Sequence, residues 1–173
     1  MANRTTEQIK DLVKNWFQDE GIKVESISNP RAEFLFKVKF QRFFFTVVRP
    51  NEKPFIQVES QVMISPQHLQ ALTADKMREF QMKTLQFSFQ QGITLGFIQP
   101  RPGQPMPQGQ KPPGPGFVIS ERLYDDAISD NQVWLLMKRV HGAVDMVIAI
   151  LNEIVGAPAG PPPVDDAGPS YYT

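Results

Sequence analysis

Histidines and paired carboxylates are the side chains of this sequence that are best suited to catalysis or metal binding. His68 and His141 are the only histidines, and neither has a second ligand residue at the spacing of a metal site. Adjacent aspartates occur at positions 125–126 and 165–166, which is common in turns and is not required for general acid–base chemistry. Because the chain has no cysteine, thiolate nucleophiles, thiolate metal sites and disulfides are excluded. We therefore expect no catalytic residue, no metal and no cofactor, and predict that the protein is not an enzyme.

A basic, phenylalanine-rich segment is the other stretch whose side chains could bind a ligand. Between residues 31 and 53, basic side chains interleave with phenylalanines, and Glu33 and Glu52 are the only acids. Basic groups on a strand face can neutralise phosphates while exposed rings stack on bases, so a ribosome- or RNA-associated factor is the alternative function. The more ordinary interpretation is a solvated strand face over a phenylalanine core. The candidate nucleic-acid contacts are Arg31, Lys37, Lys39, Arg42 and Arg49, together with Arg101 and Lys111 in a later loop.

The first half of the chain predicts one helix followed by a meander of strands. Thr5 and Gln8 have the spacing of a capping box, and apolar residues at helical spacing follow until Gly21. Residues 22–28, 34–40, 43–48 and 55–64 read as antiparallel strands. The segment 43–48 is almost continuously apolar, so we expect it to be covered on both faces.

A long middle helix is predicted for residues 65–91, opened by a serine N-cap and a proline, kinked near Thr73 and stopped by Gly92. Its second half is apolar on all sides, so we expect it to be buried once by its own sheet and once by a partner. The candidate partner-binding residues here are Met77, Phe80, Phe87 and Phe89.

The last helix has the strongest periodicity of the chain. A second capping box at Ser129 precedes apolar residues that alternate spacings of four and three from Val133 to Ile154. Such a seam packs on the sheet and also suits a second helix, so the further candidate partner-binding residues are Val140, Val144, Val147 and Leu151.

The order of elements predicts an α+β fold, with an antiparallel sheet in α-βββ(β)-α-ββ-α order and helices packed on the sheet. This layout resembles the type III secretion chaperone-like superfamily, in particular the YbjN-related small proteins, many of whose archaeal members are uncharacterised. The resemblance rests on residues 6–21, 34–48, 64–66, 118–124 and 129–153. It implies a twisted sheet backed by helices, frequent homodimers, and holding or docking on other proteins rather than catalysis.

Composition sets the domain boundaries and the expected location. Residues 1–155 are predicted to form one domain, with a Pro/Gly-rich insertion at 99–116 in a hairpin, and 156–173 to form a flexible proline-rich tail. The formal net charge is zero, which excludes a general attraction to nucleic acid or anionic membrane. No signal peptide or membrane span is expected, so we predict a cytoplasmic protein. The leading hypothesis is a non-enzymatic adaptor that docks on a larger protein, or on itself as a homodimer, through apolar helix surfaces and the proline-rich arms.

Overall fold

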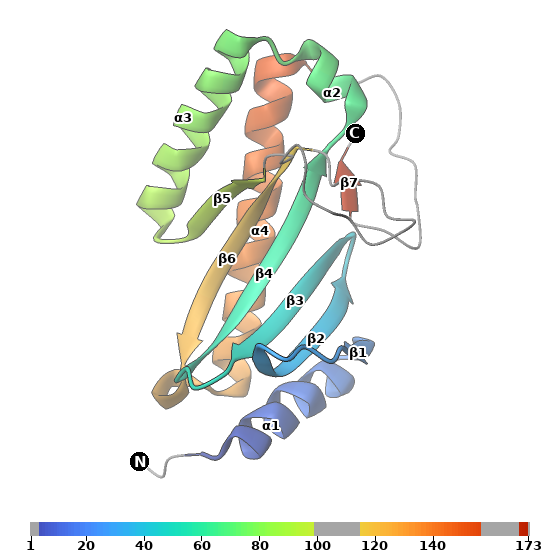
Figure 1. The fold of residues 1–173 in the computed structure, drawn as a ribbon, viewed down its shortest axis with the longest axis vertical. Helices are drawn as coiled ribbons and strands as arrows, with labels where there is room; N and C mark the ends of the chain where they lie inside the picture. Colours follow the sequence, from blue (N-terminus) through green and yellow to red (C-terminus); the bar gives the residue numbers. More distant parts are fainter. Residues whose placement is uncertain (1–3, 99–114, 157–169, 173) are drawn as a thin grey trace. The chain divides into compact units, whose positions relative to one another are not determined.

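The computed structural model describes residues 4–98, 115–156 and 170–172, and it has the predicted α+β fold and order of elements (Figure 1). The strand order is β1-β2-β3-β4-β6-β5, and β7 pairs with β4. The helices are α1 (Thr6–Asp19), α2 (Pro66–Ala71), α3 (Ala74–Gln91), the short 3-10 helix η1 (Asp125–Ala127) and α4 (Asp130–Val155). The strands are β1 (Val24–Ser26), β2 (Ala32–Phe40), β3 (Phe43–Pro50), β4 (Phe55–Ile64), β5 (Thr94–Ile98), β6 (Gly116–Tyr124) and β7 (Ser170–Tyr172).

The chain divides into two compact units that share long elements. The first unit contains Met1–Ser60 and Ser120–Ala143, and the second contains Gln61–Ile119 and Val144–Thr173. Each of β4, β6 and α4 therefore contributes residues to both units.

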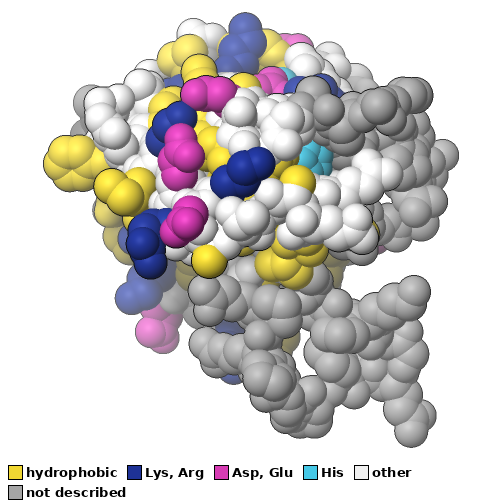
Figure 2. All heavy atoms as spheres, turned by 90° about the horizontal axis from the view of Figure 1, so that it is seen from above, with side chains coloured by type: hydrophobic (Ala, Val, Ile, Leu, Met, Phe, Trp, Pro, Cys, Tyr) yellow, Lys and Arg dark blue, Asp and Glu magenta, His cyan; other side chains and the backbone are white. Residues whose placement is uncertain are grey.

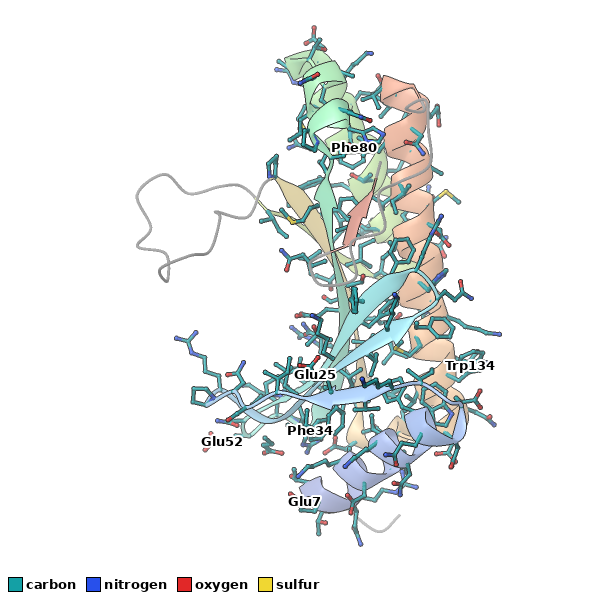
Figure 3. All side chains as sticks on the ribbon, turned by 90° about the vertical axis from the view of Figure 1, so that its right-hand side faces the viewer. Glu7, Glu25, Phe34, Glu52, Phe80 and Trp134 are labelled. Carbon is teal, nitrogen blue, oxygen red and sulfur yellow. The ribbon has the colours of Figure 1, made fainter. Side chains whose placement is uncertain are left out.

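In the first unit, α1 begins at the predicted capping box. Thr5 Oγ1 accepts a hydrogen bond from the backbone N–H of Gln8, and Gln8 Oε1 accepts one from the backbone N–H of Thr5. The apolar face of α1 is buried, and Trp16 at its end lies 5.8 Å, centroid to centroid, from Trp134 of α4. Trp134 is labelled in Figure 3. Local capping and an apolar stripe thus specify this helix, as predicted.

Strands β2 and β3 form a hairpin with one fully buried face. Phe36 and Val38 on β2, with Phe45 and Val47 on β3, point into the core, where His141 of α4 lies 6.3 Å from the Phe45 ring. The prediction that β3 is covered on both faces is wrong, because burial along it alternates between buried and half-buried residues. Its continuous apolar sequence therefore includes residues of the outer face.

The second unit contains the broken middle helix. Ser65 caps α2 and Thr73 caps α3, so the predicted kink near Thr73 is a break between two helices. Gly92, in the left-handed conformation with φ of 66°, ends α3 as expected. The Phe80 ring of α3 packs 5.9 Å from that of Phe97 on β5 and 6.3 Å from that of Phe117 on β6.

β7 lies within the segment predicted to be a flexible tail. Ser170, Tyr171 and Tyr172 pair in parallel with residues 62–64 of β4. The rest of that tail, residues 157–169, and most of the predicted insertion, residues 99–114, lie outside the described residues.

Candidate functional site

The apolar seam of α4 belongs to the chain's own core. Val140, Val144, Val147 and Leu151 are all fully buried. These residues are therefore not available as a partner-binding surface, which corrects the sequence prediction. Heptad spacing identifies a buried stripe on a helix but does not identify what covers it.

Helix α3 is buried on one side and not on two. Phe80 is fully buried, Met77 and Phe87 are half-buried, and Phe89 is 89% exposed. Of the predicted partner-binding residues, Phe89 alone is largely exposed to solvent. The second covering that the sequence predicted for this helix is not supplied by the described part of the chain.

Two residues outside the predicted set join Phe89 on this exposed side. Met82 is 68% exposed and Leu85 is 49% exposed, and with Phe89 they follow helical spacing of i, i+3 and i+7. We call these three residues the α3 stripe. Figure 2 shows hydrophobic side chains projecting at its left margin, on the side of α3 in Figure 1. The i, i+3 and i+7 spacing of Met82, Leu85 and Phe89 in the sequence could have identified the stripe.

The ion pairs of Lys83 show which side of α3 carries the stripe within the second unit. Lys83 Nζ lies 3.0 Å from Oε1 of Glu79 and 2.9 Å from Oε1 of Glu153 on α4. At about 100° per residue, the three stripe residues lie about 100–160° around α3 from Lys83. The stripe thus lies on the flank of α3 that faces away from α4.

Hydroxyl side chains occupy the inward face of α3. Thr84 Oγ1 donates to the Phe80 carbonyl oxygen at 2.7 Å, and Ser88 Oγ donates to the Leu85 carbonyl oxygen at 2.9 Å. Both side chains are buried and satisfied by their own helix. At these positions the helix buries small polar side chains while Met82, Leu85 and Phe89 remain exposed, the reverse of the usual arrangement.

The outer face of β2 and β3 carries two of the predicted basic residues beside an aromatic ring, because Lys37 Nζ lies 4.8 Å and Lys39 Nζ 5.6 Å from the centroid of Phe44. Arg42 is in the turn between the two strands, and its guanidinium lies 4.9 Å from the centroid of the buried Phe43. The two lysines point away from the buried face, as predicted. Glu25 of β1 is directly opposite Lys37, so this basic face includes an acid. Arg31 is exposed, and Arg101 and Lys111 lie outside the described residues.

Arg49 has a structural position and is not part of the basic face. Its side chain is buried, its Nε donates to Glu33 at 2.7 Å, and its two terminal nitrogens donate to both oxygens of Asp125 at 2.5 and 2.8 Å. The bidentate hydrogen bond with Asp125 raises the pKa of Arg49. Burial and two carboxylate partners remove Arg49 from the candidate nucleic-acid contacts.

The contacts of both histidines are those of residues that stabilise the fold. His68 is buried, with Nδ1 2.8 Å from Ser65 Oγ and Nε2 2.9 Å from Asn152 Oδ1. A serine, a histidine and an asparagine in a row resemble a nucleophilic triad. However, Ser65 is itself buried and accepts from the backbone N–H of His68 as the cap of α2, so the group joins α2 to α4. His141 lies among the rings of Phe40, Phe43 and Phe45.

Glu121 on β6 is the carboxylate with the most unusual surroundings. Its Oε1 lies 2.6 Å from Nη1 of Arg139, while Oε2 is buried without a hydrogen-bond partner in the described chain. Burial raises the pKa of this carboxyl, and the charge of Arg139 opposes the shift.

Among residues 4–98, 115–156 and 170–172, no cluster of three or more His, Asp or Glu could hold a metal ion. Within these same ranges, none of the helices has the length and apolar character needed to span a membrane.

Comparison with known proteins supplies a family and a fold. A sequence model described as "Uncharacterized conserved protein (DUF2299)" matches residues 9–151. The crystal structure of an uncharacterized protein from Methanothermobacter thermautotrophicus is 19% identical, covers 86% of this chain and 99% of its own, and superposes with a TM-score of 0.71. That of YbjN from E. coli is 14% identical, covers 83% and 89%, and gives a TM-score of 0.44. No match was found among curated proteins. The archaeal structure confirms the predicted α+β fold and shows that this fold is shared with an uncharacterised archaeal protein.

Proposed function

This chain belongs to the DUF2299 family of uncharacterised conserved proteins, and we propose that it is a non-enzymatic adaptor that docks on another protein through the α3 stripe. The observation that carries the proposal is the exposure of Met82, Leu85 and Phe89 on one flank of a helix. Apolar anchors at i, i+3 and i+7 are the pattern by which a helix docks into a groove on its partner.

The chemistry of the α3 stripe supports a protein partner. Burying apolar surface stabilises a complex by about 25 cal/mol per Å², and phenylalanine and methionine are common anchors at interfaces. No charged side chain occurs from residue 84 to residue 98, so a partner that covers Leu85 and Phe89 would have no ion of this segment to desolvate. The absence of cysteine fits a reducing compartment, and a cytoplasmic location is part of the proposal. The proline-rich arms lie mostly outside the described residues, so their part in docking stays a prediction.

Affinity capture from the native cell tests the proposal with matched variants. Phe89→Glu and Met82→Glu place a charge in the α3 stripe, whereas Gln90→Glu places the same charge at an exposed polar position of α3 outside the stripe. We expect the stripe variants to lose a specific set of proteins that the wild type and the Gln90→Glu variant retain. Retention of that set by the stripe variants would refute the proposal, provided that all variants melt at the wild-type temperature.

A second candidate function is favoured by the arrangement around Phe44. Two lysines over one half-buried ring provide positive charge beside an aromatic surface, which suits RNA or a ribosomal particle. Changing Lys37, Lys39 and Arg42 to glutamine should then weaken RNA binding and reduce its salt dependence by about one unit of slope for each phosphate-binding side chain replaced. If the wild type does not bind RNA near physiological salt, this second candidate is eliminated.

A further inference from the structure

One edge of β4 changes its neighbouring strand partway along its length. β3 pairs with β4 at residues 57–59, and Ser60 Oγ donates to the Phe44 carbonyl oxygen at 3.0 Å. Beyond residue 59, none of the described residues of β3 pairs with β4. The last part of this edge, from residue 61 to residue 64, is therefore open to a different strand.

The opposite edge of β4 is occupied by the start of β6. The backbone N–H of Ile64 donates to the Pro115 carbonyl oxygen at 2.9 Å, and a Cβ atom at Gly116 would clash with the Val62 carbonyl oxygen. β7 also pairs with residues 62–64 (Figure 1). Since β6 fills one edge there, β7 lies on the other, the edge that β3 uses at residues 57–59.

We propose that the edge of β4 at residues 62–64 is a peptide-binding site for one extended, uncharged strand that runs parallel to β4, and that the chain's own C-terminal strand fills this site reversibly. The resident strand is β7, whose residues 170–172 pair in parallel with residues 62–64. The site uses the backbone of β4 and is separate from the α3 stripe, so it does not depend on the function proposed for that stripe.

The residues around this edge indicate what the site would recognise. Val62, Met63 and Ile64 are buried, so recognition rests mainly on backbone hydrogen bonds, as in other cases of strand addition to a sheet. No Asp, Glu, Lys or Arg occurs from residue 60 to residue 74, and none occurs from residue 167 to residue 173. A charged strand would lose its hydration without gaining an opposite charge from these segments, which favours an uncharged ligand.

The small size of β7 is the reason to expect exchange. β7 has three residues, whereas strands average about five to six. Because the tail is covalently attached, its effective concentration at the site is in the millimolar range, and a free peptide must compete with it. Loosening β7 should therefore raise the apparent affinity of the site for a free peptide.

Peptide binding to the full chain tests the site. The probe is a fluorescently labelled peptide with the sequence of residues 168–173, and the measurement is its anisotropy. Ser170→Pro and Tyr171→Pro, introduced together, remove the backbone N–H that pairs with β4, whichever of the two residues donates it. This double variant should bind the probe about tenfold more tightly than the wild type does. A probe that carries the same two prolines is the matched control and should not bind.

A disulfide tests whether β7 fills the edge of its own chain. The chain has no native cysteine, and the Cα atoms of paired residues on neighbouring strands lie about 5 Å apart, within disulfide range. On oxidation, Val62→Cys with Ser170→Cys should form a disulfide within one chain and keep the 19.6 kDa mass of a single chain by light scattering. Probe binding should be lost and should return when the disulfide is reduced.

Three results would overturn the proposal. The first is a disulfide that links two chains, because β7 would then fill the edge of a second copy. The second is equal binding of the probe by the oxidised cysteine variant and the double-proline variant, because the probe would then bind elsewhere. The third is no binding of the probe by a double-proline variant that still melts cooperatively.

Discussion

The pKa values of two carboxyl groups in the first unit, those of Glu33 and Glu121, are shifted in opposite directions by their surroundings. Burial alone would raise the pKa of Glu33, but hydrogen bonds from Thr6, Arg49 and the backbone of Glu52 hold it below its usual value. Glu121 is more deeply enclosed, and burial raises its pKa despite Arg139. Neither residue requires a catalytic explanation, because the hydrogen bonds to Glu33 and the burial of the Glu121 carboxyl account for the two pKa shifts.

The raised pKa of Glu121 predicts a defined pH dependence of stability. A carboxyl whose pKa is higher in the folded than in the unfolded state stabilises the protein below its unfolded pKa, and this contribution is lost as pH rises through the folded pKa. Glu121→Gln removes the cost of ionising a buried group. We expect the variant to melt above the wild type at pH 7 and at nearly the same temperature near pH 4, as measured by circular dichroism.

Glu33→Gln is the matched comparison. Its lowered pKa means that the ionised form stabilises the fold above the unfolded pKa, and that this contribution is lost as pH falls through the folded pKa. This variant should therefore melt below the wild type at pH 7 and approach it at low pH. If both variants shifted in the same direction at pH 7, the assignment of opposite environments would be wrong.

At the scale of elements, the sequence predicted what local chemistry determines. The capping box at Thr5 and the interruption near Thr73, predicted as a kink, follow from side chains that bond to nearby backbone. The stop at Gly92 follows from the left-handed backbone conformation that glycine adopts without strain. Which face of a helix is buried depends on tertiary packing, which local sequence patterns do not determine. On α3, the hydroxyl groups of buried Thr84 and Ser88 donate hydrogen bonds to carbonyl oxygens of the same helix, whereas Met82 and Phe89 remain exposed. Hydropathy alone would predict that Met82 and Phe89 are buried and that Thr84 and Ser88 are exposed.

The reassignment of the α4 seam predicts unequal effects of two neighbouring substitutions. Val144 is fully buried, so Val144→Glu places an uncompensated charge in the core, at a cost of about 3–5 kcal/mol. Met146 is half exposed, and Met146→Glu should change stability by no more than about 0.5 kcal/mol. Chemical denaturation measures both. Equal stabilities of the two variants would show that the seam is not core.

At the scale of the whole molecule, the two compact units share three long elements, and the C-terminal strand adds only a short pairing. Deleting residues 158–173 removes β7 and its pairing with residues 62–64 of β4. Because the pairing with β4 involves only three residues, we expect the melting temperature to fall by about 2–4 °C at most. A fall of more than about 10 °C would make the tail an integral part of the second unit.

Site-specific photo-cross-linking tests the central claim, docking through the α3 stripe, most directly. A photoreactive residue at Leu85 would lie in the stripe, and the same residue at Gln90 would lie on an exposed polar part of α3, about 80–140° around the helix from the stripe residues. After irradiation in the native cell, we predict adducts with another protein from position 85 and none from position 90. Mass spectrometry distinguishes such adducts from cross-links to a second copy of the chain. Absence of protein adducts at position 85, or equal adducts at both positions, would contradict docking through the stripe.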